Sequence, residues 1–358
     1  MQSRILAVLL AGLVGSAAAF IHDTPSAQAA TKYCDGPKVT WRTSLWGKRR
    51  AITEGLEHVA AATKDATCGN FDLQLVYGEQ LSKSKENLDA IKVGAVQGAQ
   101  VCSSYHPGKV RALGVLDLPF LPIANLDVAQ GVYDKMFETP EFKTSLAAWN
   151  AQYFMATLLP QFEYMGRGAA PKKLDDWKGR RVRALGGMGK AMEAVGAVPT
   201  TMPASEVYTA LQRGTIDAVA FSYTYAFASF KVEELASWYT TNMSLGSINC
   251  IFAVAIDAYA KLPAPYKAIL EEAKGPAYAV LKDAYESQDK VNLPKWRANP
   301  KMTEVAYSES VLEQFRKIGG RPVWDEWIKQ NEEAGVPGRK LLDLVLATAK
   351  EAQAKTRP

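Results

Sequence analysis

Four basic residues stand close together in the run WKGRRVRALGG, which begins at Trp177 and precedes an apolar segment rich in small residues. Alternation along a strand places Arg181 and Arg183 on one face and Val182 on the other. Arg183 is the residue nearest the carboxyl end of this strand, where ligands bind to α/β sheets. Its planar guanidinium can hold a carboxylate through two parallel, charge-assisted hydrogen bonds. Arg183 is therefore a candidate anion clamp, and an ordinary surface arginine is the alternative that the pattern leaves open.

Other anion-binding and catalytic motifs do not match. A phosphate-binding loop has Ser or Thr after its Gly-Lys pair and a leading glycine six residues before the lysine. Here Ala191 follows Gly189-Lys190, and Ala184 stands at the leading position. The glycines also lack dinucleotide-binding spacing, and neither a Gly-x-Ser-x-Gly elbow nor a two-histidine metal motif occurs. The sequence predicts a binding protein and not an enzyme, with no metal and no cofactor.

The N-terminal run MQSRILAVLLAGLVGSAAAF has the layout of a secretory signal, with Arg4, an apolar stretch and then small residues. The apolar stretch is too short for a good membrane span. We expect a signal peptide at 1–29, in preference to cleavage after Ala19. An exported, soluble chain follows, and an uncleaved anchor is the alternative.

Charge and cysteine content agree with export. The net charge of +5 is small for 358 residues, and basic residues are scattered among acidic ones, so no nucleic-acid surface is expected. Cys34 and Cys68 flank the first strand–helix unit, and Cys102 and Cys250 lie in two strand-like runs. Both pairs are candidate disulfides in an oxidising compartment. Four cysteines allow three pairings, and the spacing leaves them open.

The elements that must position Arg183 alternate between strands and helices, which predicts parallel strands in an α/β architecture. In the helix expected at 84–94, the candidate apolar positions are Leu88, Ile91 and Val93. The remaining predicted elements fall into two sets. Strands are expected at 38–46, 71–78, 99–106, 151–159, 178–185, 215–225 and 247–256, and helices at 49–64, 126–136, 140–148, 186–195 and 205–214 and from 263 onwards.

The order of these elements predicts two lobes, because the chain builds one α/β unit, leaves it, builds another and returns. We expect the first part of lobe I at 30–125 and the first part of lobe II at 126–215. A return crossing into lobe I is expected at 216–250, and the rest of lobe II with the C-terminal helices at 251–358. Two lobes joined by several crossings form a cleft that can open and close.

The central block LDDWKGRRVRALGG, with AVGAVPTTMPASEVYTALQRGTIDAV after it, closely resembles a known signature. It is that of the periplasmic solute-binding subunits of TRAP (tripartite ATP-independent periplasmic) transporters, C4-dicarboxylate-binding type. Weaker similarities are GEQLSKSKENLDAIKVGAVQGA, LPFL and AYAKLPAPYKAIL, so the resemblance covers most of the chain beyond the signal. It implies an α/β, two-lobed periplasmic-binding-protein fold with several inter-lobe crossings and long C-terminal helices. It also implies a periplasmic protein that closes on an organic anion and hands it to membrane permease subunits without ATP.

The resemblance also implies site residues. Arg183 corresponds to the clamp arginine, and Ala204 and Phe221 fall at ligand-contacting positions, with Tyr223 close by. The opposite wall is expected from Trp46, Glu79 and Tyr105.

Two departures from the family pattern bear on the ligand. Gln161 resembles the glutamine of the oxoacid-binding branch more than the second arginine of sialic-acid binders, although Arg167 is nearby. Ala220-Phe221 replaces the Glu-Trp of some oxoacid binders, which argues against a metal ion beside the ligand.

One arginine with several aromatic residues favours an aromatic or 2-oxo monocarboxylate as the ligand. Tyr105, Tyr223 and Tyr225 are candidate hydroxyl donors. A C4-dicarboxylate is less favoured, because its second charge has no assigned basic partner. Two further functions stay open, a ligand-presenting partner of a membrane sensor and an exported enzyme. We expect a monomer whose partners are the small acid and the permease.

Overall fold

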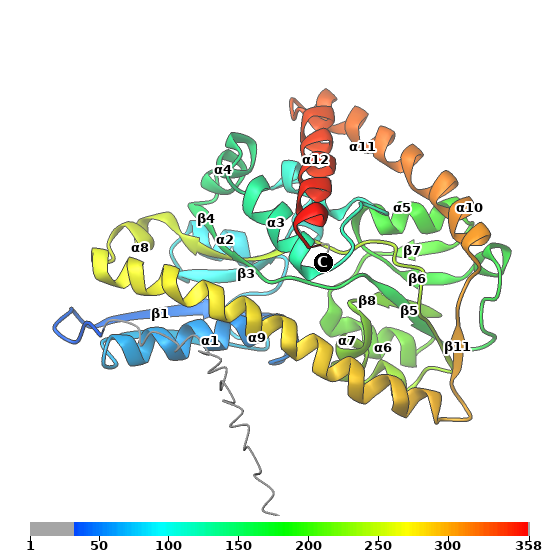
Figure 1. Cartoon of the computed structure of the whole chain (residues 1–358), viewed down its shortest axis with the longest axis horizontal. Helices are drawn as coiled ribbons and strands as arrows, with labels where there is room; N and C mark the ends of the chain where they lie inside the picture. The colour runs from blue at the N-terminus through cyan, green and yellow to red at the C-terminus, as the bar shows by residue number, and fades with distance from the viewer. Residues whose placement is uncertain (1–31, 357–358) are drawn as a thin grey trace, which may run out of the picture.

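The computed structural model describes residues 32–356, so the signal peptide predicted at 1–29 lies outside the described residues. Two β-sheets with their helices form two lobes that lie side by side (Figure 1). We call them the first lobe, built on the sheet β2-β1-β3-β10-β4, and the second lobe, built on the sheet β11-β9-β5-β8-β6-β7. The two-lobed α/β fold predicted from sequence is confirmed.

The first sheet combines parallel and antiparallel strands. β1, β2 and β3 are parallel, as their alternation with helices predicts, whereas β10 runs antiparallel to both β3 and β4. β10 enters from the second lobe and not through a local helical crossover, so the rule that makes such strands parallel does not apply to it. The strands are β1 (Val39–Ser44), β2 (Phe71–Val76), β3 (Gly98–Cys102), β4 (Ala151–Ala156) and β10 (Cys250–Ala255).

Helices cover this sheet through apolar faces. Leu88 and Ile91 of α2 are buried as predicted, but Val93 is 77% exposed because the helix ends at Lys92. The helices of this lobe are α1 (Ala51–Ala66), α2 (Asn87–Lys92), α3 (Leu126–Met136), α4 (Pro140–Ala147) and α8 (Ile256–Ala260).

The second sheet is made of short strands. β5, β7, β9 and β11 were not predicted, because strands of three or four residues are too short to show a period of two. The strands are β5 (Glu163–Gly166), β6 (Arg181–Arg183), β7 (Val198–Thr200), β8 (Ala218–Phe221), β9 (Trp238–Thr240) and β11 (Thr303–Val305). Its helices include α5 (Gly186–Ala194), α6 (Val207–Gln212) and α7 (Tyr223–Ser229).

Within the described residues three segments, which we call the crossings, connect a strand of one sheet to a strand of the other. The first crossing is 157–162 and the second is 241–249. The third is α9 (Ala264–Arg297), which packs on α1 in the first lobe and on α7 in the second, and leads to β11 (Figure 1). Three C-terminal helices then lead back: α10 (Glu309–Gly319) packs on α5, α11 (Arg321–Glu333) follows, and α12 (Gly338–Thr356) packs on α3.

The lobe boundaries predicted from sequence need correction. Residues 126–215 were assigned to the second lobe, but α3, α4 and β4 belong to the first. The segment 216–250 was taken as a return to the first lobe, yet it contributes β8 and β9 to the second sheet. β10, predicted for the second lobe, is a central strand of the first sheet. Lobe membership depends on which strands pair, and the periodicity of a strand carries no information about its partner.

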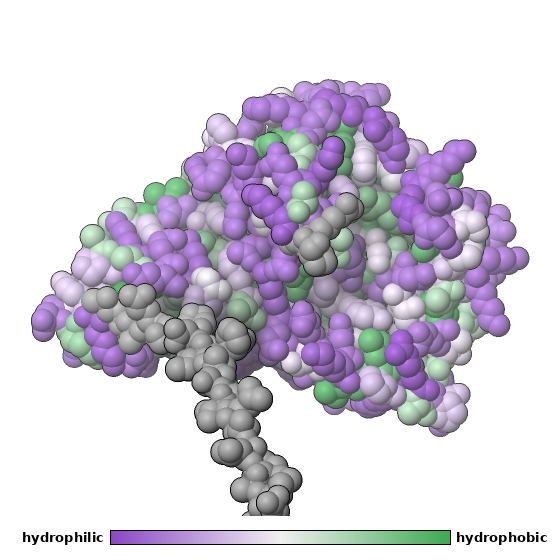
Figure 2. Space-filling view, in the orientation of Figure 1, coloured by the Kyte–Doolittle hydropathy of each residue, from purple (hydrophilic) through white to green (hydrophobic). Residues whose placement is uncertain are grey.

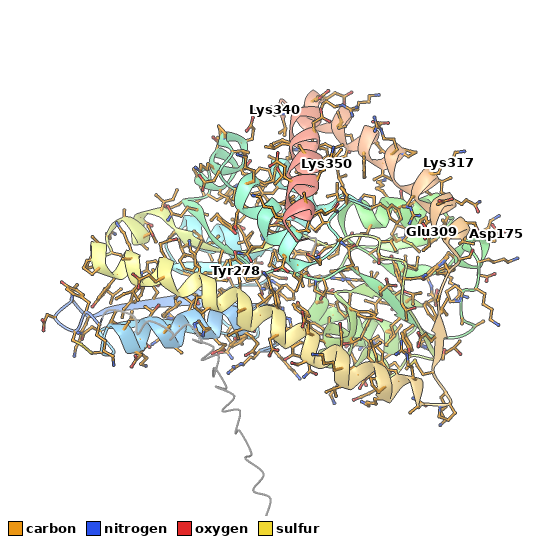
Figure 3. All side chains as sticks on the ribbon, in the orientation of Figure 1. Asp175, Tyr278, Glu309, Lys317, Lys340 and Lys350 are labelled. Carbon is orange, nitrogen blue, oxygen red and sulfur yellow. A yellow bond between two sulfur atoms is a disulfide. The ribbon has the colours of Figure 1, made fainter. Side chains whose placement is uncertain are left out.

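Tyrosine side chains fix α9 to the first lobe. The hydroxyl of Tyr278, labelled in Figure 3, accepts a hydrogen bond from the Ala156 backbone N–H at 2.9 Å. The Tyr266 hydroxyl donates to the Pro37 carbonyl oxygen at 2.8 Å, and its ring stacks on Phe71 with centroids 5.4 Å apart. The third crossing is thus anchored to β4 and to the start of the described chain.

The surface is largely hydrophilic on the face shown in Figure 2. Large apolar side chains that are exposed are separate in the sequence: Val93, Val198, Val280, Val291 and Ile318. No helix among the described residues is long and apolar enough to cross a bilayer.

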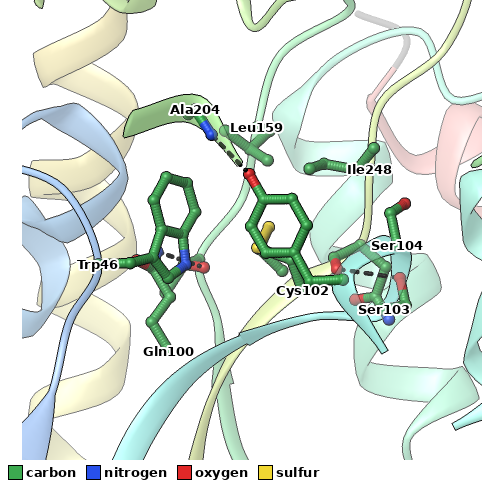
Figure 4. Close-up of a disulfide and its surroundings, with 12 residues drawn as sticks. Trp46, Gln100, Cys102, Ser103, Ser104, Leu159, Ala204 and Ile248 are labelled. Atoms are coloured by element: carbon green, nitrogen blue, oxygen red, sulfur yellow. Dashed lines mark hydrogen bonds between the residues drawn. A yellow bond between two sulfur atoms is a disulfide. The ribbon is translucent and has the colours of Figure 1, made fainter. Parts of the chain in front are cut away.

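Both candidate disulfides are present, Cys34–Cys68 and Cys102–Cys250, so the structure selects one of the three possible pairings. Cys102 and Cys250 are directly opposite each other in the register of β3 and β10. Figure 4 shows this bond close to Trp46 and Ile248. The second disulfide therefore joins the end of β3 to the point where the chain returns from the second lobe.

We predict that Gly55→Ala destabilises the packing of α9 on α1. A Cβ at Gly55 would lie 2.9 Å from the Ala277 carbonyl oxygen, so the two helices must move apart. Overpacking of this kind costs ~1–3 kcal/mol, and the midpoint of thermal unfolding should fall by about 2–6 °C. Gly189→Ala in α5 is the matched control, because its nearest neighbour outside its own turn, Pro199 Cβ, is 3.6 Å away. An equal loss of stability in both variants would contradict the close-approach argument.

Candidate ligand-binding site

A cavity of about 410 Å³ of empty volume lies where the two lobes meet, and we call it the inner cavity. The first lobe contributes Trp46, Arg50, Ala51, Ile52 and Tyr105. The second lobe contributes Arg183, Ala204, Phe221, Ser222, Tyr225, Ala226 and Phe230. The three crossings contribute Leu159, Phe162, Ile248 and Tyr285. A mainly apolar lining with a few polar groups suits a small organic ligand.

Arg183 is buried at the end of β6, with only 1% of its surface exposed. Its guanidinium donates to the Ala220 carbonyl oxygen at 2.8 Å, the Met202 carbonyl oxygen at 3.2 Å and the Tyr105 hydroxyl at 3.3 Å. These bonds use three of its five N–H groups, so two are available for a ligand. The guanidinium carbon lies 5.0 Å from the ring centroid of Phe221. Burial lowers the pKa of Arg183, and the nearby tyrosines act in the opposite direction.

Tyr105 links the lobes. It follows β3 in a short 3₁₀ turn, and its ring packs edge-on against Trp46 with centroids 5.6 Å apart. Its hydroxyl accepts hydrogen bonds from Arg183 Nη2 at 3.3 Å and from the Ala204 backbone N–H at 3.1 Å, both in the second lobe. Figure 4 shows the bond to Ala204. The structure is therefore a closed arrangement of the cleft.

The glycines after Arg183 allow the lobes to approach. In the structure they lie against the segment that follows β3. A Cβ at Gly187 would meet Pro119 Cδ at 2.5 Å and the Asp117 carbonyl oxygen at 2.9 Å. Gly186 has a φ of +51°, which L side chains rarely adopt. The start of α5 thus touches the first lobe through bare backbone.

Arg50 is a cavity residue that the sequence did not single out. It lies at the N-cap of α1 and is 4% exposed. Its Nη1 donates to the carbonyl oxygens of Trp46 and Lys48, and the guanidinium carbon lies 4.2 Å from the Trp46 ring centroid. The sequence did carry a signal. A cation at a helix N-terminus is opposed by the helix dipole, so an arginine at this position indicates some other role.

Two predicted site residues line a neighbouring cavity. This outer cavity has about 1190 Å³ of empty volume and shares Leu159 and Tyr285 with the inner one. Gln161 and Tyr223 lie on its wall, and Gln161 Nε2 donates to the Ile123 carbonyl oxygen at 2.6 Å. Gln161 and Tyr223 are therefore near the inner cavity but do not line it.

Two further predicted residues lie outside both cavities. Arg167 donates to the carbonyl oxygens of Leu211 and Gln212, which ties the end of β5 to α6. Glu79, in the turn after β2, accepts a hydrogen bond from the Ser84 backbone N–H at 2.9 Å. The structure gives both side chains local structural contacts.

Glu163 on β5 is a buried carboxylate on the wall of the outer cavity. It accepts hydrogen bonds from the Thr240 hydroxyl at 2.5 Å and from the backbone N–H groups of Ser244 at 2.8 Å and Met243 at 3.1 Å. Burial raises the pKa of Glu163 to about 7, and these hydrogen bonds act in the opposite direction. The carboxylate thereby holds the start of the second crossing against β5.

Metal ligands are not grouped in the part of the chain that the structure describes, where no three His, Cys, Asp or Glu side chains are placed to hold an ion. At the end of β8, next to Arg183, stand Ala220 and Phe221. The described site can therefore hold a ligand through guanidinium N–H donors and between aromatic side chains.

Comparison with known proteins identifies the family. The family model of the bacterial extracellular solute-binding proteins, family 7, matches residues 43–331. The monocarboxylate 2-oxoacid-binding periplasmic protein of Nostoc sp. is 26% identical over 298 residues, covering 79% of this chain and 78% of the relative. The C4-dicarboxylate-binding periplasmic protein DctP of Rhodobacter capsulatus is 29% identical over 271 residues, covering 73% and 75%.

Solved structures agree on the fold. The TRAP solute-binding protein of a marine metagenome, described as specific for aromatic acid ligands and solved with 3-hydroxybenzoate, superposes with a TM-score of 0.79 at 20% identity. The similarity covers 88% of this chain and 99% of that protein. This chain thus shares the two-lobed fold of that protein.

We predict a component of stability that falls as pH rises, because Glu163 has a raised pKa. The folded state retains a proton there that the unfolded state loses above its ordinary pKa of 4.5. The free energy of unfolding should therefore decrease between about pH 4.5 and 7, by ~3 kcal/mol at most. Glu163→Gln should remove this component in urea unfolding measured from pH 4.5 to 8.

Glu304→Gln is the control for Glu163→Gln. The Arg297 guanidinium and the Tyr239 hydroxyl lower the pKa of Glu304 below its ordinary value of 4.5, so its stabilising contribution is lost only below about pH 4.5. The difference in unfolding free energy between wild type and Glu304→Gln should therefore stay constant from pH 4.5 to 8. A constant difference in unfolding free energy between wild type and Glu163→Gln across the range would contradict the Glu163 assignment.

Proposed function

Because the chain belongs to family 7 of the bacterial extracellular solute-binding proteins, we propose that it captures an organic acid anion in the inner cavity and delivers it to the membrane subunits of a TRAP transporter. Members of this family bind solutes and are not enzymes, so the cleft is a binding site. The proposed ligand is a small acid with a compact apolar or aromatic body.

The observation that carries this proposal is the buried positive charge of Arg183. Its guanidinium is buried at the junction of the lobes, and its hydrogen bonds go to neutral oxygens. A buried cation is costly without a counter-charge, and a ligand carboxylate supplies one. Two free N–H groups suit the two oxygens of a carboxylate.

The cleft supports a closure mechanism. The ligand carboxylate binds Arg183 in the second lobe while the ligand body packs between Phe221 and Trp46, which stand in different lobes. Tyr105 then joins the lobes through its bonds to Arg183 and Ala204. A ligand that contacts both lobes has higher affinity for the closed state and shifts the population toward it.

The ligand class draws on the relatives and on the lining. The relatives are described as binding a 2-oxo monocarboxylate, a C4-dicarboxylate or aromatic acids. The aromatic lining of the inner cavity supports an aromatic or apolar body. The sequence-based preference for a monocarboxylate rested on the lack of a second basic residue, and Arg50 now lines the same cavity.

The proposal includes a location and partners. Relatives are described as periplasmic proteins, and residues 1–29 would direct export of this chain. It would act as a monomer that docks on the permease.

A thermal-shift screen tests the proposed function. The exported chain is tested against aromatic acids, 2-oxo acids, dicarboxylates, sialic acid and neutral sugars. An acid at 100 times its dissociation constant should add about 2.7 kcal/mol to the free energy of unfolding. Stabilisation by acids and not by sugars is the expected result. Stabilisation by no acid would contradict the proposal.

Arg183→Ala should weaken binding of the best acid by at least about tenfold, because each charge-assisted hydrogen bond contributes ~1.5–3 kcal/mol. The measurement is titration calorimetry on folded protein. Arg181→Ala is the matched control on the same strand, since Arg181 is exposed and paired with Asp217 at 2.6 Å. We expect the affinity of the Arg181→Ala variant for the acid to match that of wild type. Equal effects of the two variants would reject the clamp.

A further inference from the structure

We propose that Arg50 is a second ligand-binding cation of the inner cavity and that the ligand carries two anionic groups separated by an apolar body. This inference rests on the proposed function, because it concerns the same cleft. It assigns one anionic group to Arg183 in the second lobe and the other to Arg50 in the first lobe.

The first argument is the incomplete hydrogen bonding of Arg50. Nη1 donates to the carbonyl oxygens of Trp46 and Lys48 and so holds the turn before α1. Nη2 is buried and has no partner. A purely structural role uses only one side of the guanidinium, which leaves the N–H groups of Nη2 for a ligand. The Trp46 Nε1 N–H, in the same cavity, is also buried without a partner. Two unused donors in the first lobe indicate an acceptor-rich group at this end.

The second argument is charge. Arg50 and Arg183 both line the inner cavity, and no Asp or Glu among the described residues lines it. Their hydrogen bonds go to carbonyl oxygens and a tyrosine hydroxyl. Burial lowers the pKa of Arg50 to about 10, so it remains charged at neutral pH. A monoanion would neutralise one guanidinium and leave the other uncompensated, whereas a dianion neutralises both.

The third argument is the aromatic framework between the two cations. Arg183 lies 5.0 Å from the Phe221 ring centroid, and Phe221 stacks on Phe230 with centroids 5.0 Å apart. Arg50 lies 5.6 Å from the Phe230 centroid. On the other side, Trp46 and Tyr105 pack edge-on at 5.6 Å. Both guanidiniums therefore border one aromatic-walled space, which fits an apolar spacer between two anionic groups.

The neighbouring outer cavity has the opposite character. Its wall includes Glu163, Glu286 and Asp289, and no Lys or Arg among the described residues. A dianion is therefore favoured in the inner cavity and disfavoured in the outer one. This contrast confines the inferred ligand to the space between Arg50 and Arg183.

The test compares matched pairs of ligands by titration calorimetry at pH 7. Each pair is a dicarboxylate and its half-amide, which is almost the same shape but carries one negative charge. The pairs are built on succinate, adipate, benzene-1,3-dicarboxylate and benzene-1,4-dicarboxylate. We expect at least one dicarboxylate to bind wild type about tenfold or more tightly than its half-amide. Half-amides that bind as tightly as the diacids throughout would overturn the inference.

Arg50→Gln and Arg50→Lys assign the preference to a residue. Arg50→Gln should bring the affinity ratio of diacid to half-amide close to one while changing half-amide binding by less than about threefold. Arg50→Lys keeps the charge and should retain part of the ratio. A ratio unchanged in Arg50→Gln would reject Arg50 as the second contact. If Arg50→Gln does not fold, Arg50→Lys decides. A ratio of diacid to half-amide affinity equal to that of wild type would count against the inference. A change in half-amide affinity with no change in this ratio would also count against it.

Failure of the inference differs from failure of the proposed function. If monoacids bind and Arg183→Ala abolishes that binding, the proposed function stands whatever the diacid ratio is. If neither these diacids and half-amides nor any monoacid of the thermal-shift panel binds, the proposed function itself is wrong.

Discussion

Positive charge held away from water is the constraint on which the cleft depends. Arg183 and Arg50 are almost fully buried, one in each lobe, and the oxygens around them are neutral. A buried ion of this kind is stable only when other charges or well-placed dipoles compensate it. The protein supplies dipoles and aromatic faces, and under the proposed function the ligand supplies the counter-charge. Ligand binding and closure of the cleft would then be linked by the same electrostatics.

The crossings keep this arrangement in place. The second crossing, 241–249, is held near its start by Glu163, which binds the backbone of Met243 and Ser244. Its far end is held by Asp117, which accepts the Asn249 N–H at 2.6 Å. Both carboxylates are buried, so the connection is fixed by internal hydrogen bonds at each end. Motion between the lobes must then bend the residues between these anchors.

The sequence predicted those features that depend on local pattern. The helix expected at 126–136 coincides with α3, because the Asn125 side chain caps it and its apolar positions repeat with the helical period. Arg183 was found because a strand pattern and a family signature coincide on it. Arg50 was not, because the sequence does not show that Phe230 of the second lobe packs over its guanidinium. The assignment of β10 to the first sheet is likewise a matter of tertiary pairing.

The Cys102–Cys250 disulfide matters most when the chain is not folded. It joins residues 148 apart in sequence, and the segment between them contains β5 to β9 of the second sheet. In the unfolded ensemble this segment is a closed loop, and its lost conformational freedom contributes about 5 kcal/mol to stability in the chain-entropy model. When the second lobe unfolds locally, the disulfide keeps the two ends of the segment that contains β5 to β9 joined. Each refolding then starts with the base of the cleft already in place.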